Sequence, residues 1–115
     1  MPKREDAVRL HHMLDAARKA QQFIEGRTRA AVERDEPLTL ALIRLLEIIG
    51  EAAKSVSAET REQYPDIPWK EIGGTRDRLI HGYFDVDWDI VCKVIENDIP
   101  KLKSQIDILV NQWNV

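Results

Sequence analysis

The sequence has little of several features that would point to a specialised class of protein. Its single cysteine, Cys92, can form no disulfide within the chain and offers too few thiolates for a zinc site. No apolar run approaches the roughly 20 residues that span a bilayer, and the start of the chain lacks the apolar segment of a signal peptide. Five glycines and five prolines in 115 residues exclude a collagen-like or low-complexity chain. We therefore expect a cytoplasmic protein that does not enter a membrane.

Positive charge is also scarce. The chain carries 17 Lys and Arg residues against 20 Asp and Glu residues, a net charge of −3, whereas proteins that coat nucleic acids are strongly basic. The balance is uneven, because residues 1–34 have a net charge of +3 and residues 35–115 a net charge of −6. A local basic surface and an ordinary solvated helix face both remain open for the first third. The hydrophobic residues, 43% of the chain, suffice for the core of one domain, residues 1–115.

Hydrophobic residues recur at three and four positions along most of the chain, which predicts helices, and no alternating run predicts a strand. The segment 27–36 extends the first helix or forms a loop. Pro100 must kink or split the last helix, and Asp98 is a candidate cap for its second half. The pattern predicts an all-α bundle of about four main helices. Longer helices are expected over about 5–25, 37–56, 75–81 and 88–113, with short turns over 58–63 and 69–72.

The helix predicted over 37–56 is apolar on nearly all sides, so it must be buried in the centre of the fold or in an oligomer. Gly50 lies inside this helix and costs about 1 kcal/mol relative to alanine, which indicates that another helix approaches closely there. Ser57 and Asp87 are predicted helix N-caps. The polar stripe of the helix is narrow and consists of Arg44, Glu47, Glu51 and Lys54.

Most motifs of metal and nucleotide chemistry are absent, including phosphate-binding glycine loops, HExxH and GxSxG. His11 and His12 are neighbours on one helix, about 100° apart, so they cannot both face one metal ion and are expected to be exposed or half-buried. Cys92 is expected to be buried as a small hydrophobe. We predict neither a metal site nor a cofactor.

The stretch Gly73–Phe84 is unusual because it brings two arginines, an aspartate, a histidine and a tyrosine close together. Arginine suits phosphate oxygens, and histidine exchanges protons near neutral pH. Arg76 and His81 are about 140° apart on a helix, but His81 precedes Gly82 at the predicted helix end, where its ring can turn towards a cleft. The ordinary alternative is a histidine that interacts with the helix dipole beside arginines in surface pairs.

These residue types together fit cleavage of RNA without a metal ion. A base takes the proton of the 2′-hydroxyl, an acid protonates the leaving 5′-oxygen, and a cation stabilises the charge on phosphorus. One chain supplies only one good titrating group at this place, His81. A two-fold dimer would bring two histidines and two arginines to one cleft.

Arg76, His81 and Tyr83 match the R-x4-H-x-Y signature of HepT-like HEPN-domain proteins, the toxins of HEPN/MNT toxin–antitoxin modules. The resemblance runs from the second predicted helix to the C-terminus. It implies an all-α homodimer with a metal-independent endoribonuclease site at the two-fold axis. The segments that carry the resemblance are IIGEAAK at 48–54, PDIPWKEIGG at 65–74, RDRLIHGYFDVD at 76–87 and NDIPKLKSQI at 97–106.

The resemblance also implies a role for each motif residue. Arg76 would bind the RNA phosphate together with Arg78, His81 would be the acid–base residue, and Asp77 would orient one of them. Tyr83 would be the residue to which a minimal nucleotidyltransferase (MNT) antitoxin adds AMP, which places bulk and negative charge beside the cationic site. Two alternatives remain open: a non-catalytic helical dimer that binds a nucleotidyltransferase or a nucleotide, and an assembly module.

Overall fold

A computed structural model describes residues 4–81 and 85–113, and of Ile80 and His81 it describes the backbone alone. The expected all-α class is confirmed, since most of these residues are helical. The described residues form the helices α1 to α8, the π-helix η1 and, between α6 and α7, one pair of very short strands. In chain order the elements are α1 (Arg4–Ile24), α2 (Arg29–Arg34), α3 (Glu36–Ser55), α4 (Ala58–Gln63), α5 (Trp69–Gly73), α6 (Thr75–Leu79), β1 (Ile80–His81), β2 (Asp85–Val86), α7 (Trp88–Lys93), η1 (Val94–Asp98) and α8 (Ile99–Trp113).

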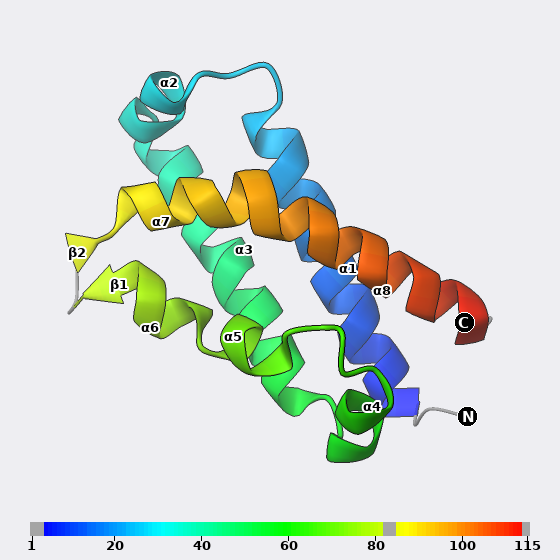
Figure 1. Ribbon diagram of the computed structural model, residues 1–115. Coiled ribbons are helices and arrows are strands. Elements are labelled where there is room, and N and C mark those ends of the chain that lie inside the picture. The colour runs from blue at the N-terminus through cyan, green and yellow to red at the C-terminus, as the bar shows by residue number, and fades with distance from the viewer. Residues whose placement is uncertain (1–3, 82–84, 114–115) are drawn as a thin grey trace.

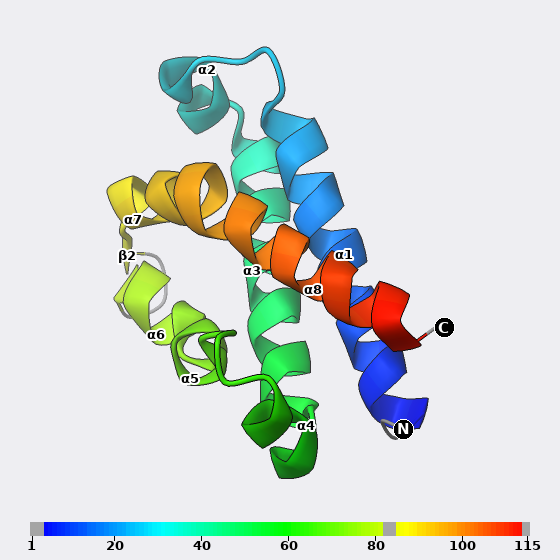
Figure 2. The ribbon, with the colours of Figure 1, turned by 45° about the vertical axis from the view of Figure 1, so that its right-hand side comes forward.

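Helix α3 is the centre of the fold, as its apolar sequence predicts. It packs against α1 along its length and against α5 and α6 on another side. The rod made of α7, η1 and α8 crosses α3 and α1 (Figures 1 and 2). In the described part of the chain, no helix is both long enough and apolar enough to cross a membrane. Most of the large, fully buried side chains come from α1, α3 and α8, and they include Leu10, Met13, Leu42, Leu46 and Ile106.

Gly50 is the point where α5 touches α3. A Cβ atom added at Gly50 would lie 3.1 Å from the carbonyl oxygen of Ile72 and 3.7 Å from that of Gly73. The close approach that the sequence indicated is therefore confirmed. Because α5 leads directly into α6, this contact sets the distance between α6 and the central helix.

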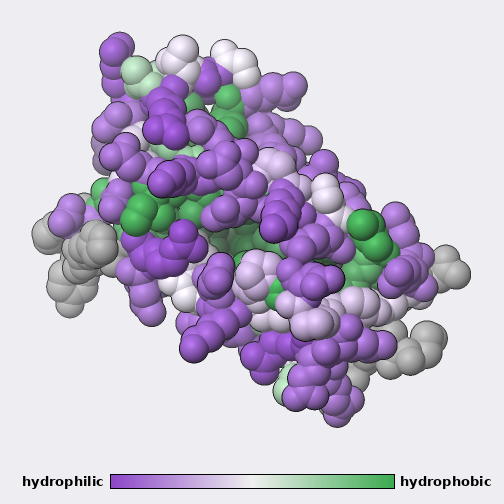
Figure 3. Space-filling view, viewed as in Figure 1, coloured by the Kyte–Doolittle hydropathy of each residue, from purple (hydrophilic) through white to green (hydrophobic). Residues whose placement is uncertain are grey.

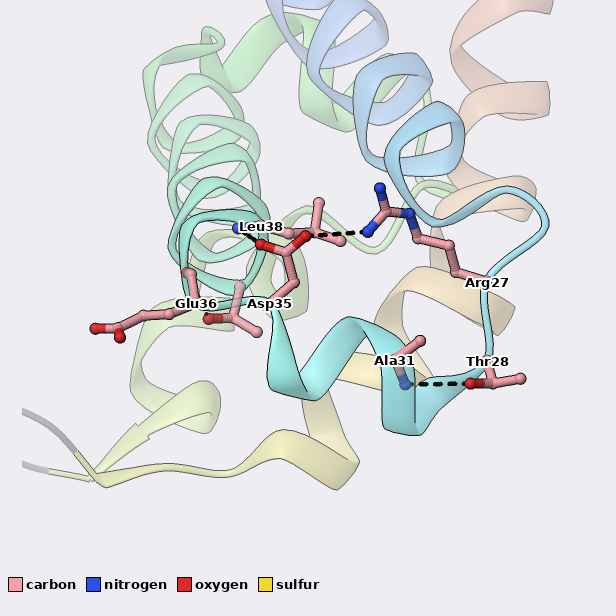
Figure 4. A network of polar contacts seen from close by, with 7 residues as sticks. Arg27, Thr28, Ala31, Asp35, Glu36 and Leu38 are labelled. Carbon is pink, nitrogen blue, oxygen red and sulfur yellow. Dashed lines mark hydrogen bonds and ion pairs between the residues drawn. The ribbon is translucent and has the colours of Figure 1, made fainter.

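Side chains at the helix ends fix where several helices begin. Ser57 caps α4 and Asp87 caps α7, so both predicted N-caps are confirmed. The segment 27–36 does not extend the first helix, since Gly26 adopts a positive φ of 73° after α1 and the chain turns into α2. Thr28 caps α2, and Asp35 accepts a bond from the Leu38 amide at the start of α3 while pairing with Arg27 at 3.1 Å (Figure 4).

A buried carboxylate joins α1 to the start of α4. Asp6 is only 2% exposed. Its Oδ1 accepts a bond from the Ser57 amide at 2.9 Å, and its Oδ2 accepts bonds from the hydroxyls of Ser57 and Thr60, both at 2.6 Å. A buried charge is tolerated only with such partners. Asp6 thus fastens two segments that are about fifty residues apart in the chain.

The C-terminal helix accommodates Pro100 with a π-helical turn and is not broken there. A proline ring clashes with the carbonyl four residues earlier in an α-helix. Here the turn before it is a π-helix, and the Ile99 amide donates to the Val94 carbonyl five residues back. The expectation that Asp98 caps a separate second half is wrong, because the backbone remains helical through Asp98 and needs no cap.

The expectation of a helix through His81 without any strand is also wrong. Helix α6 ends at Leu79, and the next two residues form β1, which pairs antiparallel with β2. Ile80 lies opposite Val86, and His81 lies opposite Asp85. The amide of Asp87 closes the ladder by donating to the Leu79 carbonyl at 2.7 Å.

The remaining candidate residues of the sequence lie as expected. His11 is half-buried and His12 is exposed on α1. Cys92 is buried, and this burial raises the pKa of its thiol. A thiol with a raised pKa is a weak nucleophile at neutral pH, which agrees with a packing role.

Candidate functional site

The motif residues begin at a turn that packs against the central helix. Gly73 ends α5 so close to α3 that an added Cβ would lie 3.0 Å from the Cγ atom of Lys54. After Gly74 the chain starts α6, with the Thr75 hydroxyl donating to the Glu71 carbonyl at 3.3 Å. Helix α6 ends at Leu79, which is fully buried. These contacts place α6 and β1 at the end of the molecule opposite the start of α1 and the end of α8 (Figures 1 and 2).

Arg76 reaches from α6 towards the exposed side of α3. Its Nε atom lies 3.6 Å from Oε2 of Glu47. The Arg76 side chain is 68% exposed, whereas that of Glu47 is 21% exposed. Two charges at this distance attract by about 1 kcal/mol in water, and ion pairs at the surface contribute little to stability. Arg76 is therefore held in place weakly and is accessible to a ligand.

Arg78 lies on the other side of α6, since two residues correspond to about 200° of helix rotation. It is exposed at the rim of a groove of about 490 Å³ between α5, α6 and the C-terminal rod. Figure 3 shows apolar residues at the bottom of a hollow in this face. The structure thus separates the two arginines that the sequence grouped for RNA binding. The groove floor includes Leu46, Ile49, Ile72, Ile99 and Leu102.

Asp77 is exposed; its amide donates to the Gly74 carbonyl at 3.1 Å, but its carboxylate forms no hydrogen bond or ion pair with a described residue. The acidic partner of Arg76 is Glu47, not Asp77. Sequence reasoning placed Glu47 in the polar stripe of α3 but did not connect it with the motif. The sequence offered one signal for Glu47: it belongs to the polar stripe of α3 and lies close to Gly50, where α5 approaches. Its pairing with Arg76, 29 positions later, is seen only in the fold.

His81 and Tyr83 were the other predicted site residues. The backbone of His81 lies in β1, five positions after Arg76, and its side chain lies outside what the structure describes. Tyr83 lies outside the described residues altogether. The strand pair therefore fixes the main chain on both sides of Tyr83, at His81 and at Asp85.

The clearest electrostatic coupling among the described groups is far from this motif in the sequence. Arg29 on α2 forms two hydrogen bonds to the carboxylate of Glu96 on η1, at 3.1 and 3.0 Å. This pairing lowers the pKa of Glu96 and raises that of Arg29. Within residues 4–79 and 85–113, no three His, Cys, Asp or Glu side chains lie close enough together to hold a metal ion.

Comparison with known proteins gives one family. The pattern of the family described as "Ribonuclease HepT-like" matches residues 13–109, which include the whole of α3, α6 and both strands. No solved structure matches the chain.

Several curated proteins are similar over most of their length. A protein of Methanocaldococcus jannaschii named "Putative RNase" is 35% identical over 109 residues, which are 95% of this chain and all of that protein. Another of that name, from Caldanaerobacter subterraneus, is 41% identical over 84% of this chain and 87% of its own length. A "Probable ribonuclease HepT" of Thermococcus cleftensis is 44% identical over 65% of this chain and 68% of its own.

Proposed function

The chain belongs to the HepT-like ribonuclease family, and on this premise we propose that it is an endoribonuclease whose reaction is carried by Arg76 and His81. The observation that best supports this assignment is the exposure of Arg76 on α6, five positions before His81 in β1. An exposed guanidinium offers donors in a fixed fork that matches phosphate. The net charge of −3 does not oppose RNA binding if contact is confined to such local cations.

In the proposed reaction the 2′-hydroxyl of RNA attacks the neighbouring phosphorus without a metal ion. A neutral His81 takes the hydroxyl proton as the bond from the 2′-oxygen to phosphorus forms. A protonated His81 of a second copy gives its proton to the 5′-oxygen as the bond from phosphorus to that oxygen breaks. Arg76 stabilises the charge that gathers on the phosphoryl oxygens. The products are a 2′,3′-cyclic phosphate and a 5′-hydroxyl.

This scheme requires a homodimer, because each chain brings one histidine to the motif. Leu40, Arg44, Glu47 and Glu51 follow one another at helical spacing along one side of α3, beside Arg76. Leu40 is 60% exposed, which is high for a leucine on the central helix. We place the two-fold contact on this side of α3, so that the two motifs share one cleft.

We further propose that the protein is the toxin of a toxin–antitoxin pair and that a minimal nucleotidyltransferase neutralises it by adding AMP to Tyr83. Tyr83 lies between His81 and Asp85 in sequence, and these two residues are paired across the strands. A nucleotide attached beside Arg76 would bring negative charge to the place where RNA phosphate binds. Asp77 and Arg78 have secondary roles in this proposal: Asp77 orients the motif, and Arg78 binds a phosphate farther along the RNA.

The nuclease proposal is tested by cleavage of a single-stranded RNA with purified variants. Arg76→Ala and His81→Ala should each lower the cleavage rate by about 10²-fold or more. Arg18→Ala is the matched control, because Arg18 is also an exposed arginine in an ion pair, to Asp107 at 3.4 Å. If the wild type cleaves no RNA but forms a homodimer that binds a nucleotidyltransferase or a nucleotide, the non-catalytic alternative replaces the nuclease.

The modification is tested by intact mass after incubation with the nucleotidyltransferase and ATP. The chain has two tyrosines, so Tyr64→Phe is the natural control for Tyr83→Phe. Tyr64 is half-buried, and its hydroxyl accepts a bond from the Trp113 indole at 2.9 Å. The added mass should persist in Tyr64→Phe and vanish in Tyr83→Phe. A gain that persists in Tyr83→Phe would remove Tyr83 as the acceptor.

A further inference from the structure

We propose that Glu47 is a positioning residue of the ribonuclease site. Its carboxylate lies 3.6 Å from Nε of Arg76, whose side chain stays 68% exposed and so remains accessible to the RNA phosphate. This inference rests on the proposed role of Arg76 in RNA cleavage. Nothing in the motif itself points to Glu47, because it lies 29 positions earlier on a different helix.

The two partners of this ion pair are held to different degrees. Glu47 follows Leu46, which is 1% exposed, on the long central helix, and its own side chain is 21% exposed. Arg76 lies on the five-residue helix α6, and its side chain is 68% exposed. Glu47 is therefore the fixed partner, and the long arginine side chain is the one that gains order from the pair.

The Arg76 guanidinium remains accessible to a phosphate while it pairs with Glu47. The contact between Arg76 and Glu47 is from Nε to Oε2, at 3.6 Å, and the Arg76 guanidinium forms no hydrogen bond with any described residue. The two Nη groups can then donate in parallel to two oxygens of one phosphate. Without Glu47, Arg76 would sample many rotamers, and each productive encounter would require the side chain to become ordered first.

The charge of Glu47 and the alignment that it gives to Arg76 act on different steps. A phosphodiester carries one negative charge, and more negative charge gathers on its oxygens during the attack. Because Glu47 partly neutralises Arg76, it weakens the attraction for the ground state, while the transition state still gains from the aligned donors. Removing the carboxylate should therefore strengthen RNA binding and slow the chemical step.

The experiment compares Glu47→Gln with Asp15→Asn in steady-state cleavage of a single-stranded RNA. Asp15 is the control, because it also pairs with an arginine, Arg18 at 4.0 Å, is 64% exposed and lies on α1, outside the proposed cleft. Both substitutions remove one negative charge and keep the shape of the side chain. Thermal unfolding of each variant checks that the fold is retained.

For Glu47→Gln we expect kcat to fall by up to about fivefold, the most that an attraction of this strength can supply, and KM to fall. Asp15→Asn should keep kcat within about twofold. Glu47→Asp, which keeps the charge on a shorter side chain, should recover part of kcat and the wild-type KM. A purely structural role would lower kcat without lowering KM and would lower the unfolding temperature.

Two results would overturn the inference separately from the proposed function. If Arg76→Ala abolishes cleavage while Glu47→Gln behaves like Asp15→Asn, Arg76 is catalytic and Glu47 does not position it. An increased kcat in Glu47→Gln would show that the carboxylate only competes with RNA. If Arg76→Ala itself retains full activity, the proposed site is wrong, and the role of Glu47 falls with it.

Discussion

Replacement of Asp6 by alanine should destabilise the protein strongly, because this carboxylate is the buried link between α1 and α4. It accepts bonds from the Ser57 amide, the Ser57 hydroxyl and the Thr60 hydroxyl at 2.9, 2.6 and 2.6 Å. A hydrogen bond to a charged group contributes about 1.5–3 kcal/mol. Ser57 is half-buried, so water can replace some of the lost bonds, and energies within one network do not add.

We therefore expect Asp6→Ala to lower the free energy of unfolding by about 3–5 kcal/mol, a large part of the roughly 5–15 kcal/mol that holds a domain together. The unfolding temperature should fall by about 10–20 °C. The assay is urea unfolding followed by circular dichroism, with the slope against urea compared between variants.

Asp15→Ala is the control for this experiment. Asp15 lies on the same helix, but it is 64% exposed and pairs with Arg18 only at 4.0 Å. Its loss should change the free energy of unfolding by about 0.5 kcal/mol or less. Asp6→Asn keeps the shape and one acceptor oxygen, so it should fall between the two. A loss below about 1 kcal/mol for Asp6→Ala would refute the claim that the buried carboxylate holds these segments together.

Four further predictions follow from other contacts. Gly50→Val should lower the free energy of unfolding by about 1–3 kcal/mol in urea, since a Cβ there meets the Ile72 carbonyl at 3.1 Å; an unchanged value would contradict the close packing. Arg29 lowers the pKa of Glu96, so this pair stabilises the protein fully above pH 4.5, the ordinary pKa of the carboxyl. The stabilisation is lost as the pH falls through the lowered pKa of the folded protein. The difference in unfolding temperature between the wild type and Glu96→Gln should therefore shrink as the pH falls over this range. Cys92 should react with a thiol reagent more slowly in the native protein than in urea at the same pH, because burial raises its pKa; equal rates would contradict its burial. Arg78→Ala should raise KM and reduce the salt slope of RNA binding by about 1 while leaving kcat nearly unchanged; a loss of kcat equal to that of Arg76→Ala would place both arginines at one phosphate.

Local signals in the sequence predicted much of the fold. Ser57 and Asp87 cap helices as expected, because capping depends on a side chain and an amide two or three positions later. Gly50 marked the contact with α5, because a glycine inside a buried helix is rarely kept without a close neighbour. The strand pair was missed because two residues on each side show no alternation. The one local signal for a hairpin was Gly82, which lies in the sequence between the paired residues Ile80 and Val86.

Contacts between distant segments could not be predicted in the same way. The pairing of Arg76 with Glu47 and of Asp6 with Ser57 depends on how helices pack, which no local pattern encodes. The separation of Arg76 from Arg78 follows from their spacing on a helix, but that Arg78 faces the groove depends on how α6 packs against its neighbours. Asp98 was misjudged because a π-helix absorbs the proline without a new helix start.

The central claim is that Arg76 and His81 cleave RNA through its 2′-hydroxyl. The most direct measurement is the rate at which 2′,3′-cyclic phosphate ends appear on a single-stranded RNA, compared between the wild type and His81→Ala. We predict that the wild type forms these ends and that His81→Ala forms them about 10²-fold more slowly or worse. Equal rates in the two proteins, or 5′-phosphate ends in the wild type, would contradict the account.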